Sequence, residues 1–327
     1  MEGGFTVTSA RSADPTVLLE LAAALRRTLR TRGEQLPAAW PEEATADLRT
    51  GRLEGCLVTD PRGGRALGIL SLRERHAFGQ IHVDAEGEPP HRVALAERSL
   101  VALAELRPAG CELLDVGVTG LTDAEEESLS GLLRGRPEMD PIRRFGLVRP
   151  LSSADPPAPL ELPPGYRWGL SQEVGIAELA LLDVAAFQDG PDASFLSDTP
   201  EGDQRLLAGI RAGQLGRVLE EASPTLIDPE GRTVGFALTV EESARSALLA
   251  DLALDPHARG RGLGRALLVR VLRALVALGH SEARLWVTEA NAPARALYDS
   301  TGFRPEATAY VYRVRRQAGS SPSPHSG

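Results

Sequence analysis

The chain has 327 residues, which is too many for one typical hydrophobic core and suits two domains of about 150 residues each. Its content of 42% hydrophobic and 25% charged residues is ordinary for a globular protein. The formal net charge of -9 argues against general nucleic-acid binding, which requires a basic surface. We therefore expect no nucleic-acid partner.

Nothing in the sequence indicates an oxidising compartment or a membrane. Both cysteines, Cys56 and Cys111, lie in apolar surroundings, so we expect buried free thiols rather than a disulfide or a zinc site. The N-terminus lacks the charged-then-apolar layout of a secretion signal. No window reaches the roughly 18 uncharged apolar residues of a membrane span. We expect a cytoplasmic protein with no metal and no membrane partner.

The first half of the chain alternates between strand and helix patterns. Ser12 to Pro15 offer a cap and a first-turn proline for an amphipathic helix that runs to about Arg30. Short apolar or alternating runs predict strands, and longer runs with helical spacing predict helices. The expected strands are 5–9, 55–60, 66–72, 80–84, 113–118 and 142–148, and the expected helices are 15–30, 92–106 and 123–133.

A proline-rich stretch separates the two halves. Residues 151–164 contain five prolines, which stiffen the chain and withhold backbone donors, so we expect an interdomain linker. The last residues, 317–327, are small, polar and broken by proline, and we expect them to be disordered. These limits predict one domain at 1–150 and a second at 165–316.

The second half again alternates between strands and helices. The expected strands are 165–169, 217–222, 225–228, 232–241, 248–254, 282–288 and 307–314, and the expected helices are 171–187, 203–211, 265–278 and 292–301. Four segments repeat those of the first half in the same order, at a nearly constant spacing of about 170 residues. The chain is therefore expected to be an α/β protein built from two copies of one mixed-sheet fold.

A glycine- and arginine-rich loop at 259–265 is the strongest chemical signal. It follows an apolar strand that ends at Leu254 and precedes a helix. Glycines let the backbone approach a ligand, and the free N–H groups and dipole of the helix start attract an anion. The glycines fall at every second position, which excludes the dinucleotide fingerprint, and the chain has no lysine for a P-loop.

The spacing Arg259-x-x-Gly262-x-Gly264 resembles the pyrophosphate loop of the GCN5-related N-acetyltransferases, the GNAT superfamily. The resemblance continues in Asn291-x-x-Ala294-x-x-Leu297-Tyr298, followed by Gly302-Phe303. It implies a GNAT fold along about 150 residues of the second half, with a V-shaped gap between strands 248–254 and 282–288. It also implies acetyl-CoA, or another short acyl-CoA, as the donor.

The resemblance assigns the donor-binding residues. Backbone groups of Leu252, Ala253 and Leu254 would hold the pantetheine arm as if it were an added strand. Asn291 occupies the family's position for a side chain that touches this arm, and Arg295 is a candidate phosphate ligand. The guanidinium groups of Arg259, Arg261 and Arg265 would add charge-assisted contacts to the pyrophosphate. The backbone N–H groups that would hold it are those of Gly260, Arg261, Gly262, Leu263, Gly264 and Arg265.

Direct attack of an amine on a thioester needs a base, an oxyanion donor and an acid. Asp251 is a carboxylate within an apolar strand beside the expected gap, and we interpret it as the base, with Glu241 and Glu242 as alternatives. The backbone N–H of Leu252 or Ala253 would bind the oxyanion. Tyr298 occupies the family's position for the residue that protonates the leaving thiolate.

The first copy lacks the anion loop. Glu86-Gly87-Glu88-Pro89-Pro90 stands in its place, where two carboxylates repel phosphate and two prolines remove N–H donors. We interpret this copy as a GNAT-like domain without a cofactor site. A tandem arrangement with one degenerate copy is similar to that of the mycothiol synthases, which acetylate an amino group on a cysteine-derived pseudodisaccharide.

The sequence leaves the acceptor open. Carboxylates are dense between the first two helices of the second copy, which favours either a wall for a cationic amine or a solvated acidic loop; they are Asp183, Asp189, Asp192, Asp198, Glu201 and Asp203. The leading hypothesis is an N-acetyltransferase for a small-molecule amine, acting as a monomer or homodimer. The alternatives are a protein lysine or N-terminal acetyltransferase and a non-catalytic acyl-CoA sensor.

Overall fold

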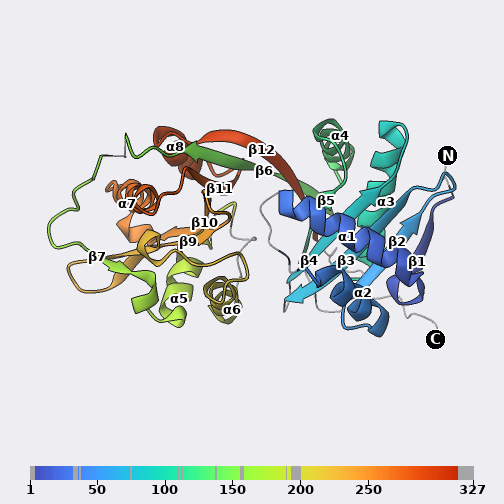
Figure 1. Ribbon diagram of the computed structural model, residues 1–327, viewed down its shortest axis with the longest axis horizontal. Helices are drawn as coiled ribbons and strands as arrows, with labels where there is room; N and C mark the ends of the chain where they lie inside the picture. The colour runs from blue at the N-terminus through green and yellow to red at the C-terminus, as the bar shows by residue number, and fades with distance from the viewer. Residues whose placement is uncertain are drawn as a thin grey trace. The chain divides into compact units, whose positions relative to one another are not determined.

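The computed structural model divides the chain into two compact units that exchange strands (Figure 1). The first unit comprises residues 1–143 and 309–327, and the second comprises residues 144–308. The structure describes residues 4–31, 36, 38–73, 76–108, 111, 113–136, 138–154, 158–188, 190–192 and 200–315. The predicted disordered end, 317–327, lies outside these residues.

The first unit is a mixed sheet with helices on both faces. Its elements are β1 (Thr6–Ser9), α1 (Pro15–Thr31), α2 (Trp40–Thr50), β2 (Glu54–Thr59), β3 (Arg65–Arg73), β4 (His76–Asp84), α3 (Pro89–Glu105), β5 (Leu113–Thr119) and α4 (Asp123–Leu133). Its strands follow the order β1-β2-β3-β4-β5-β12, where β12 (Arg304–Arg315) is the last strand of the chain. Helix α2 was not expected from the sequence.

The second unit repeats this plan. Its elements are β6 (Met139–Pro150), β7 (Arg167–Leu170), α5 (Ile176–Phe187), α6 (Pro200–Arg211), β8 (Pro224–Ile227), β9 (Thr233–Glu241), β10 (Ser246–Leu254), α7 (Leu263–Ala277), β11 (Glu282–Thr288) and α8 (Ala292–Ser300). The strand order is β6-β11-β10-β9-β8-β7, in which only the β10–β11 pair is parallel among the pairs described. The expected α/β class and tandem architecture are confirmed.

Two sequence expectations about local structure are wrong. Residues 217–222 were expected to form a strand, but Val218 makes only an isolated bridge to Val240 and residues Glu220–Ala222 form a 3-10 turn. The helix expected from Ser171 begins at Ile176, because a 3-10 turn at Ser171–Glu173 and the extended Gly175 precede it. Leu219 and Ala222 are buried, so the apolar pattern of 217–222 reports burial and not strand pairing.

One strand of each unit lies on the other side of the domain boundary that the sequence predicted. Residues 144–150 of β6 pair with β11, and residues 311–315 of β12 pair with β5. The predicted boundaries, 1–150 and 165–316, instead placed β6 in the first domain and β12 in the second. The pattern of a strand identifies its buried face but not its partner, which depends on the free sheet edge that the rest of the fold offers.

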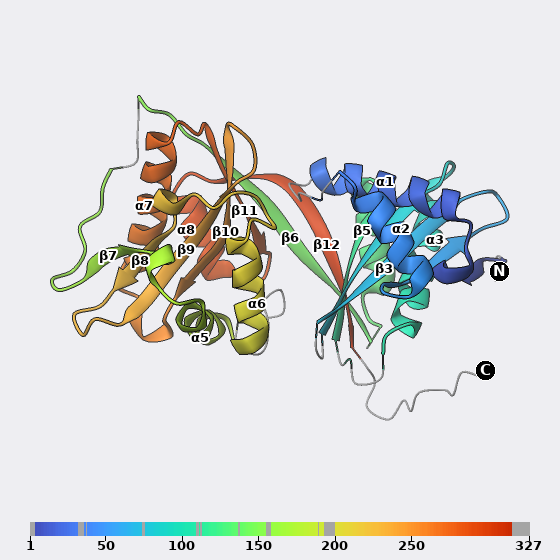
Figure 2. The ribbon, with the colours of Figure 1, turned by 60° about the horizontal axis from the view of Figure 1, so that its bottom comes forward.

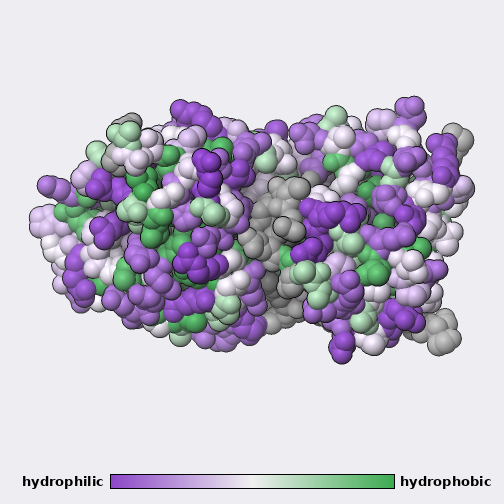
Figure 3. Space-filling view, viewed as in Figure 1, coloured by the Kyte–Doolittle hydropathy of each residue, from purple (hydrophilic) through white to green (hydrophobic). Residues whose placement is uncertain are grey.

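Both units bury apolar residues on each face of the sheet. In the second unit, α7 and α8 lie on one side of β9 and β10, and α5 and α6 lie on the other (Figures 1 and 2). Hydrophobic residues appear on the visible surface only as small patches among hydrophilic ones (Figure 3). Within the described residues, no helix has both the length and the apolar character needed to cross a bilayer.

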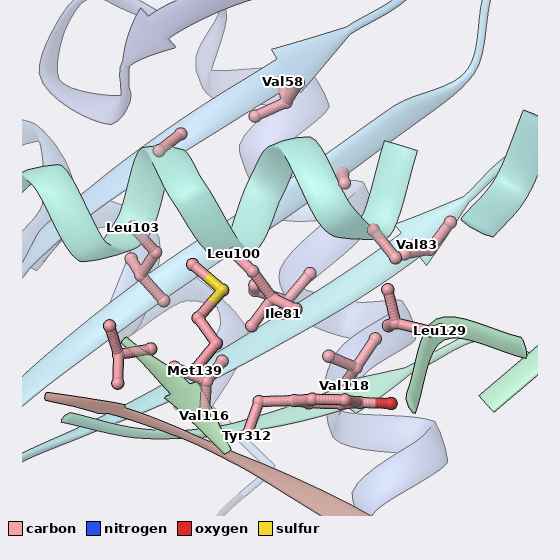
Figure 4. Close-up of a cluster of buried hydrophobic side chains, with 14 of the residues drawn as sticks. Val58, Ile81, Val83, Leu100, Leu103, Val116, Val118, Leu129, Met139 and Tyr312 are labelled. Carbon is pink, nitrogen blue, oxygen red and sulfur yellow. The ribbon is translucent and has the colours of Figure 1, made fainter. Parts of the chain in front are cut away.

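Tyr312 of β12 anchors the strand exchange in the first unit. Its ring lies among side chains of β4, β5 and α4, including Ile81, Val116 and Leu129 (Figure 4). It is fully buried, and its hydroxyl lies 3.4 Å from the carbonyl oxygen of Glu126. Apart from its β12 neighbours Tyr310 and Val314, the buried members of this core precede Tyr312 by more than 170 residues.

We predict that Tyr312→Ala lowers the free energy of unfolding by about 3–5 kcal/mol, because it leaves a ring-sized cavity in this core. Urea denaturation followed by circular dichroism measures the change. Leu160→Ala, which truncates an exposed side chain, is the control and should change the value by less than about 0.5 kcal/mol. Equal effects for the two variants would contradict the exchange of β12.

Candidate active site

The two parallel strands of the second unit separate soon after they begin. β10 and β11 pair only at Ser246–Glu282, Ala247–Ala283 and Leu248–Arg284. Beyond these pairs β10 stays with β9 as far as Leu254, and β11 stays with β6 as far as Thr288. The gap that the resemblance implied between strands 248–254 and 282–288 is therefore present between β10 and β11.

Backbone groups line both walls of this gap. The N–H of Asp255 donates to the carbonyl of Val234 on β9. Along an antiparallel pair, successive residues point their backbone groups alternately toward the partner strand and away from it. Leu252 and Leu254 therefore turn their N–H and C=O groups away from β9. These are two of the three residues expected to hold a pantetheine arm. The same alternation turns Ala253 toward β9, so of the two oxyanion donors considered only the N–H of Leu252 faces the gap, where it also lies within hydrogen-bonding reach of the Asp251 carboxylate.

The glycine–arginine loop forms an open cradle of amides at the start of α7. Gly260 and Gly262 both have φ of +75°, and a Cβ on either would meet no atom within 4 Å. Among the described residues, no protein acceptor takes the backbone N–H groups of residues 260–265. Consecutive free amides at a helix N-terminus bind anions, so this cradle fits a phosphorylated ligand.

The three loop arginines contact neighbouring elements of the second unit. Arg259 donates to the carbonyl of Ala186 at the end of α5, Arg261 donates to the Tyr166 hydroxyl at 3.2 Å, and Arg265 donates to the Ser300 hydroxyl at 3.0 Å. All three contacts are exposed. The arginines thus hold the loop between α5, the segment before β7, and α8, and their contact with a phosphate stays a prediction.

Tyr298 lies in α8 on the face that packs against the sheet. Its side chain is 9% exposed, and its ring meets Phe303 edge-on with centroids 5.8 Å apart. Burial, together with the charges of Asp192 and Asp251, raises the pKa of its hydroxyl. The hydroxyl is therefore protonated at neutral pH, as a proton donor must be.

Asp251 lies on β10 just beyond a bulge and one residue before Leu252. It is 7% exposed, and burial, with the charge of Asp203, raises the pKa of its carboxyl group to about 7. Burial disfavours the charged form of a carboxyl group, and a nearby like charge acts in the same direction. A carboxylate with this pKa can exchange a proton near neutral pH.

Glu241, the alternative base, lies at the far end of β9. Glu241 pairs with Ala247 of β10, whereas Asp251 pairs with Leu238 of β9. Glu241 and Leu238 are three residues apart on β9, which is about 10 Å along the strand. The Glu241 carboxylate accepts a hydrogen bond from Arg217 at 3.1 Å. Glu242 accepts from the Ser246 hydroxyl at 2.7 Å. Both glutamates therefore lie where β10 and β11 are still paired, away from the open part of the gap.

Asn291 caps α8 and is held by Asp192. Its carbonyl oxygen accepts from the N–H of Ala294 at 3.1 Å, and its amide nitrogen donates to Asp192 at 2.6 Å. Asp192 also accepts from the backbone N–H of Thr288 at 3.2 Å and from its hydroxyl. The sequence indicated Asn291 as a donor-binding residue but gave no signal for its link to Asp192, which lies 99 residues earlier in the chain.

Arg295 lies on another face of α8. Its guanidinium group is 5.1 Å from the centre of the Phe145 ring and donates to the carbonyl of Glu289 at 2.9 Å. It lines a cavity of about 380 Å³ with Phe145, Leu147 and Phe303, on the β6 side of α8. Leu297, by contrast, approaches Gly264 of the loop. The role of Arg295 as a phosphate ligand stays a prediction.

The expected acidic wall is largely buried. Asp183 of α5 and Asp203 of α6 are both 0% exposed, and Asp192 is 9% exposed, so neither an open wall nor a solvated loop describes them. Asp189 and Asp198 lie outside the described residues. Glu201 remains exposed. Charge density in a sequence does not report burial, which here depends on how α5 and α6 pack on β10.

The first unit has no corresponding gap. β4 and β5 stay paired from His76–Leu113 through His82–Thr119. Near the end of the pair the ring Nδ1 of His82 lies 3.0 Å from the Thr119 hydroxyl, and burial lowers the pKa of His82. α3 begins with Pro89 and Pro90, which have no N–H, and the next two N–H groups, those of His91 and Arg92, donate to the carbonyl of Glu88. Both the gap and the amide cradle of the second unit are thus missing among the described residues here.

Comparison with known proteins agrees with this geometry. The model of the acetyltransferase (GNAT) family matches residues 190–303. A mycothiol acetyltransferase of Thermomonospora curvata is 30% identical over 277 residues, which cover 81% of this chain and 85% of the relative. The chain belongs to the GNAT family. It is an N-acetyltransferase, as the sequence predicted.

Solved GNAT structures share the fold over nearly the whole chain. A GCN5-related N-acetyltransferase from Sphaerobacter thermophilus has a TM-score of 0.60 at 18% identity and covers 95% of each chain. A tandem GNAT protein from the clavulanic acid biosynthesis pathway has a TM-score of 0.54 at 14% identity, covering 96% of this chain and 98% of its own. The tandem arrangement of two GNAT-like units in the present chain therefore occurs also in a solved structure.

We predict that Asp192→Ala lowers the free energy of unfolding by about 2–3 kcal/mol, because it leaves the buried N–H of Thr288 and the amide of Asn291 without their acceptor. Thermal and urea denaturation measure this loss. Asp299→Ala removes a carboxylate whose side chain is 81% exposed and serves as the control. A loss no larger than that of the control would show that Asp192 does not hold the β11–α8 turn.

Proposed function

We propose that this GNAT protein transfers an acetyl or other short acyl group from coenzyme A to the primary amine of a small molecule, and that only the second unit performs the reaction. The observation that carries the proposal is the combination of a gap between β10 and β11 with an open amide cradle at residues 260–265. The first unit has neither feature among its described residues.

The fit to an acyl-CoA rests on the free backbone groups. The cradle offers N–H groups to two phosphates, and the glycines keep that surface clear of side chains. Leu252 and Leu254 offer N–H and C=O groups to a pantetheine arm, which carries amides that can pair with them as a strand would. When bound, the coenzyme supplies an acyl group activated as a thioester.

Three side-chain and backbone groups would carry the chemistry. Asp251 removes a proton from the acceptor ammonium group, because its pKa of about 7 lets it act as a base near neutral pH. The N–H of Leu252 stabilises the negative charge that develops on the acyl oxygen. Tyr298, protonated at neutral pH, donates a proton to the departing sulfur.

The acceptor is proposed from the relatives. The match to the relative named mycothiol acetyltransferase extends over 85% of that relative's length. This supports, as the acceptor, a small amine of the cysteine-derived pseudodisaccharide kind. Against a protein acceptor, the carboxylates that could attract a basic peptide are buried at Asp183, Asp192 and Asp203.

We predict that Gly262→Glu abolishes binding of coenzyme A, because the new side chain fills the cradle with negative charge and strains a residue at positive φ. Isothermal titration calorimetry with coenzyme A measures the affinity. Gly279→Glu is a matched control: Gly279 has φ of +85° and open surroundings but lies at the other end of α7. Retained affinity in Gly262→Glu would refute the assignment of the loop.

We predict that Tyr298→Phe and Asp251→Asn each lower kcat by roughly 10²–10⁴-fold with little change in affinity for coenzyme A, because each removes a proton-transfer group. Release of free thiol from acetyl-CoA over a panel of amines, lysine peptides included, measures turnover. The same assay on Glu241→Gln decides between the two carboxylates. Micromolar binding of coenzyme A without turnover of any amine would favour the sensor instead.

A further inference from the structure

Three carboxyl groups from different elements meet beneath the gap. Asp183 comes from α5, Asp203 from α6 and Asp251 from β10, and they are 0%, 0% and 7% exposed. Asp183 lies within hydrogen-bonding contact of both others. Apolar side chains of the same elements surround them, among them Leu179, Leu207 and Ala253.

Asp183 has no ordinary partner. Among the described residues, neither of its carboxylate oxygens receives a hydrogen bond from an N–H or hydroxyl donor. The charges that act on it are those of Asp251 and Asp203. Two carboxyl groups can hydrogen-bond only if one of them carries a proton, and ionising all three in an apolar site would be very unfavourable.

Asp183 is the group that holds this proton. Burial, and then the charges of Asp251 and Asp203, raise the pKa of Asp183 well above its ordinary value. A neutral Asp183 donates to Asp251, which favours the ionised form of Asp251, as does the backbone N–H of Leu252. The charge of Asp203 acts in the opposite direction and favours protonation of Asp251.

We propose that Asp183 and Asp203 are positioning residues for the base: a protonated Asp183 donates its one O–H to the Asp251 carboxylate, and the charge of Asp203 makes Asp251 basic enough to take the proton of the acceptor amine. This inference rests on the proposed function, since it concerns the same reaction. It assigns a role to two buried residues of α5 and α6 that do not touch the substrate.

The proton transfer balances within the cluster. The acceptor R–NH₃⁺ gives one proton to the Asp251 carboxylate and becomes R–NH₂, while Asp251 becomes a neutral acid. That acid now faces one neutral neighbour, Asp183, and one charged neighbour, Asp203, so the negative charge of the cluster falls by one. The proton leaves to solvent after the amide has formed, which restores the ionised Asp251.

Within the part of the chain that the structure describes, Asp251 also interacts electrostatically with Tyr298 of α8, which interacts in turn with Asp192. On β9 the residue beside Asp251 is the apolar Leu238. Asp192 is already satisfied by Thr288 and Asn291. The carboxylate of Asp203 is therefore the charge whose removal should most affect the pKa of Asp251.

The first test is the pH profile of kcat/KM for acetyl transfer to the amine that the panel identifies. In the wild type, activity should fall as pH drops through about 7, where Asp251 becomes protonated. Asp203→Asn should move this acid limb down by roughly one to two pH units, because it removes a like charge. Asp183→Asn, which resembles the neutral acid and keeps a donor, should leave the limb close to its wild-type position.

The second test needs no substrate. A carboxyl group with a raised folded pKa stabilises the fold fully below the unfolded value near 3.8 and loses that contribution as pH rises through the folded value near 7. The wild-type melting temperature should therefore drop between pH 5 and pH 8 more than that of Asp203→Asn or Asp183→Asn. Glu178→Gln, which removes an exposed carboxylate of α5, is the control and should show the wild-type drop.

The two tests separate this inference from the proposed function. An Asp203→Asn variant that loses turnover equally at every pH, with its acid limb unmoved, would overturn the inference. So would melting curves of both asparagine variants that keep the full wild-type pH dependence. Absence of turnover in the wild type, together with a reduced pH dependence of melting in the variants, would support the cluster and refute the transfer reaction.

Discussion

The separation of β10 from β11 after three residue pairs is the constraint on which the site depends. Each strand keeps a full ladder on its outer side, to β9 and to β6, so the separation leaves unpaired backbone groups only within the gap. Buried N–H and C=O groups are unfavourable without partners, and an extended amide-bearing ligand can provide them. The ladder geometry therefore favours the same ligand as the cradle at the start of α7.

The first unit shows what the fold is like without this separation. There β4 and β5 remain paired to their ends, and the contact between His82 and Thr119 joins them where the second unit opens. At the start of α3, Pro89 and Pro90 have no N–H to offer to an anion. The two units thus share one architecture and differ in how far their central parallel strands pair and in the residues at the following helix start, rather than in the layout of helices and strands.

Burial explains the electrostatics of the second unit. Asp183, Asp203 and Asp251 lie between apolar faces of α5, α6 and β10, where water cannot solvate their charges. Such an arrangement is unfavourable for stability alone, because apolar residues would pack there without the desolvation penalty. Clusters of perturbed titratable groups beside a ligand gap are typical of functional sites. This cluster includes Asp251, the residue that we interpret as the base.

The sequence by itself determined the GNAT family, the α/β class, most helices and strands, and the positions of the loop at 259–265 and of Tyr298, because these follow from local spacing and periodicity. It did not determine which edge β6 and β12 complete, which amides of β10 face the gap, or that Asp192 holds Thr288 and Asn291. Nor did it show that Asp183 and Asp203 are buried against Asp251. Those properties arise from pairing and packing between segments far apart in the chain, so only the tertiary structure decided them.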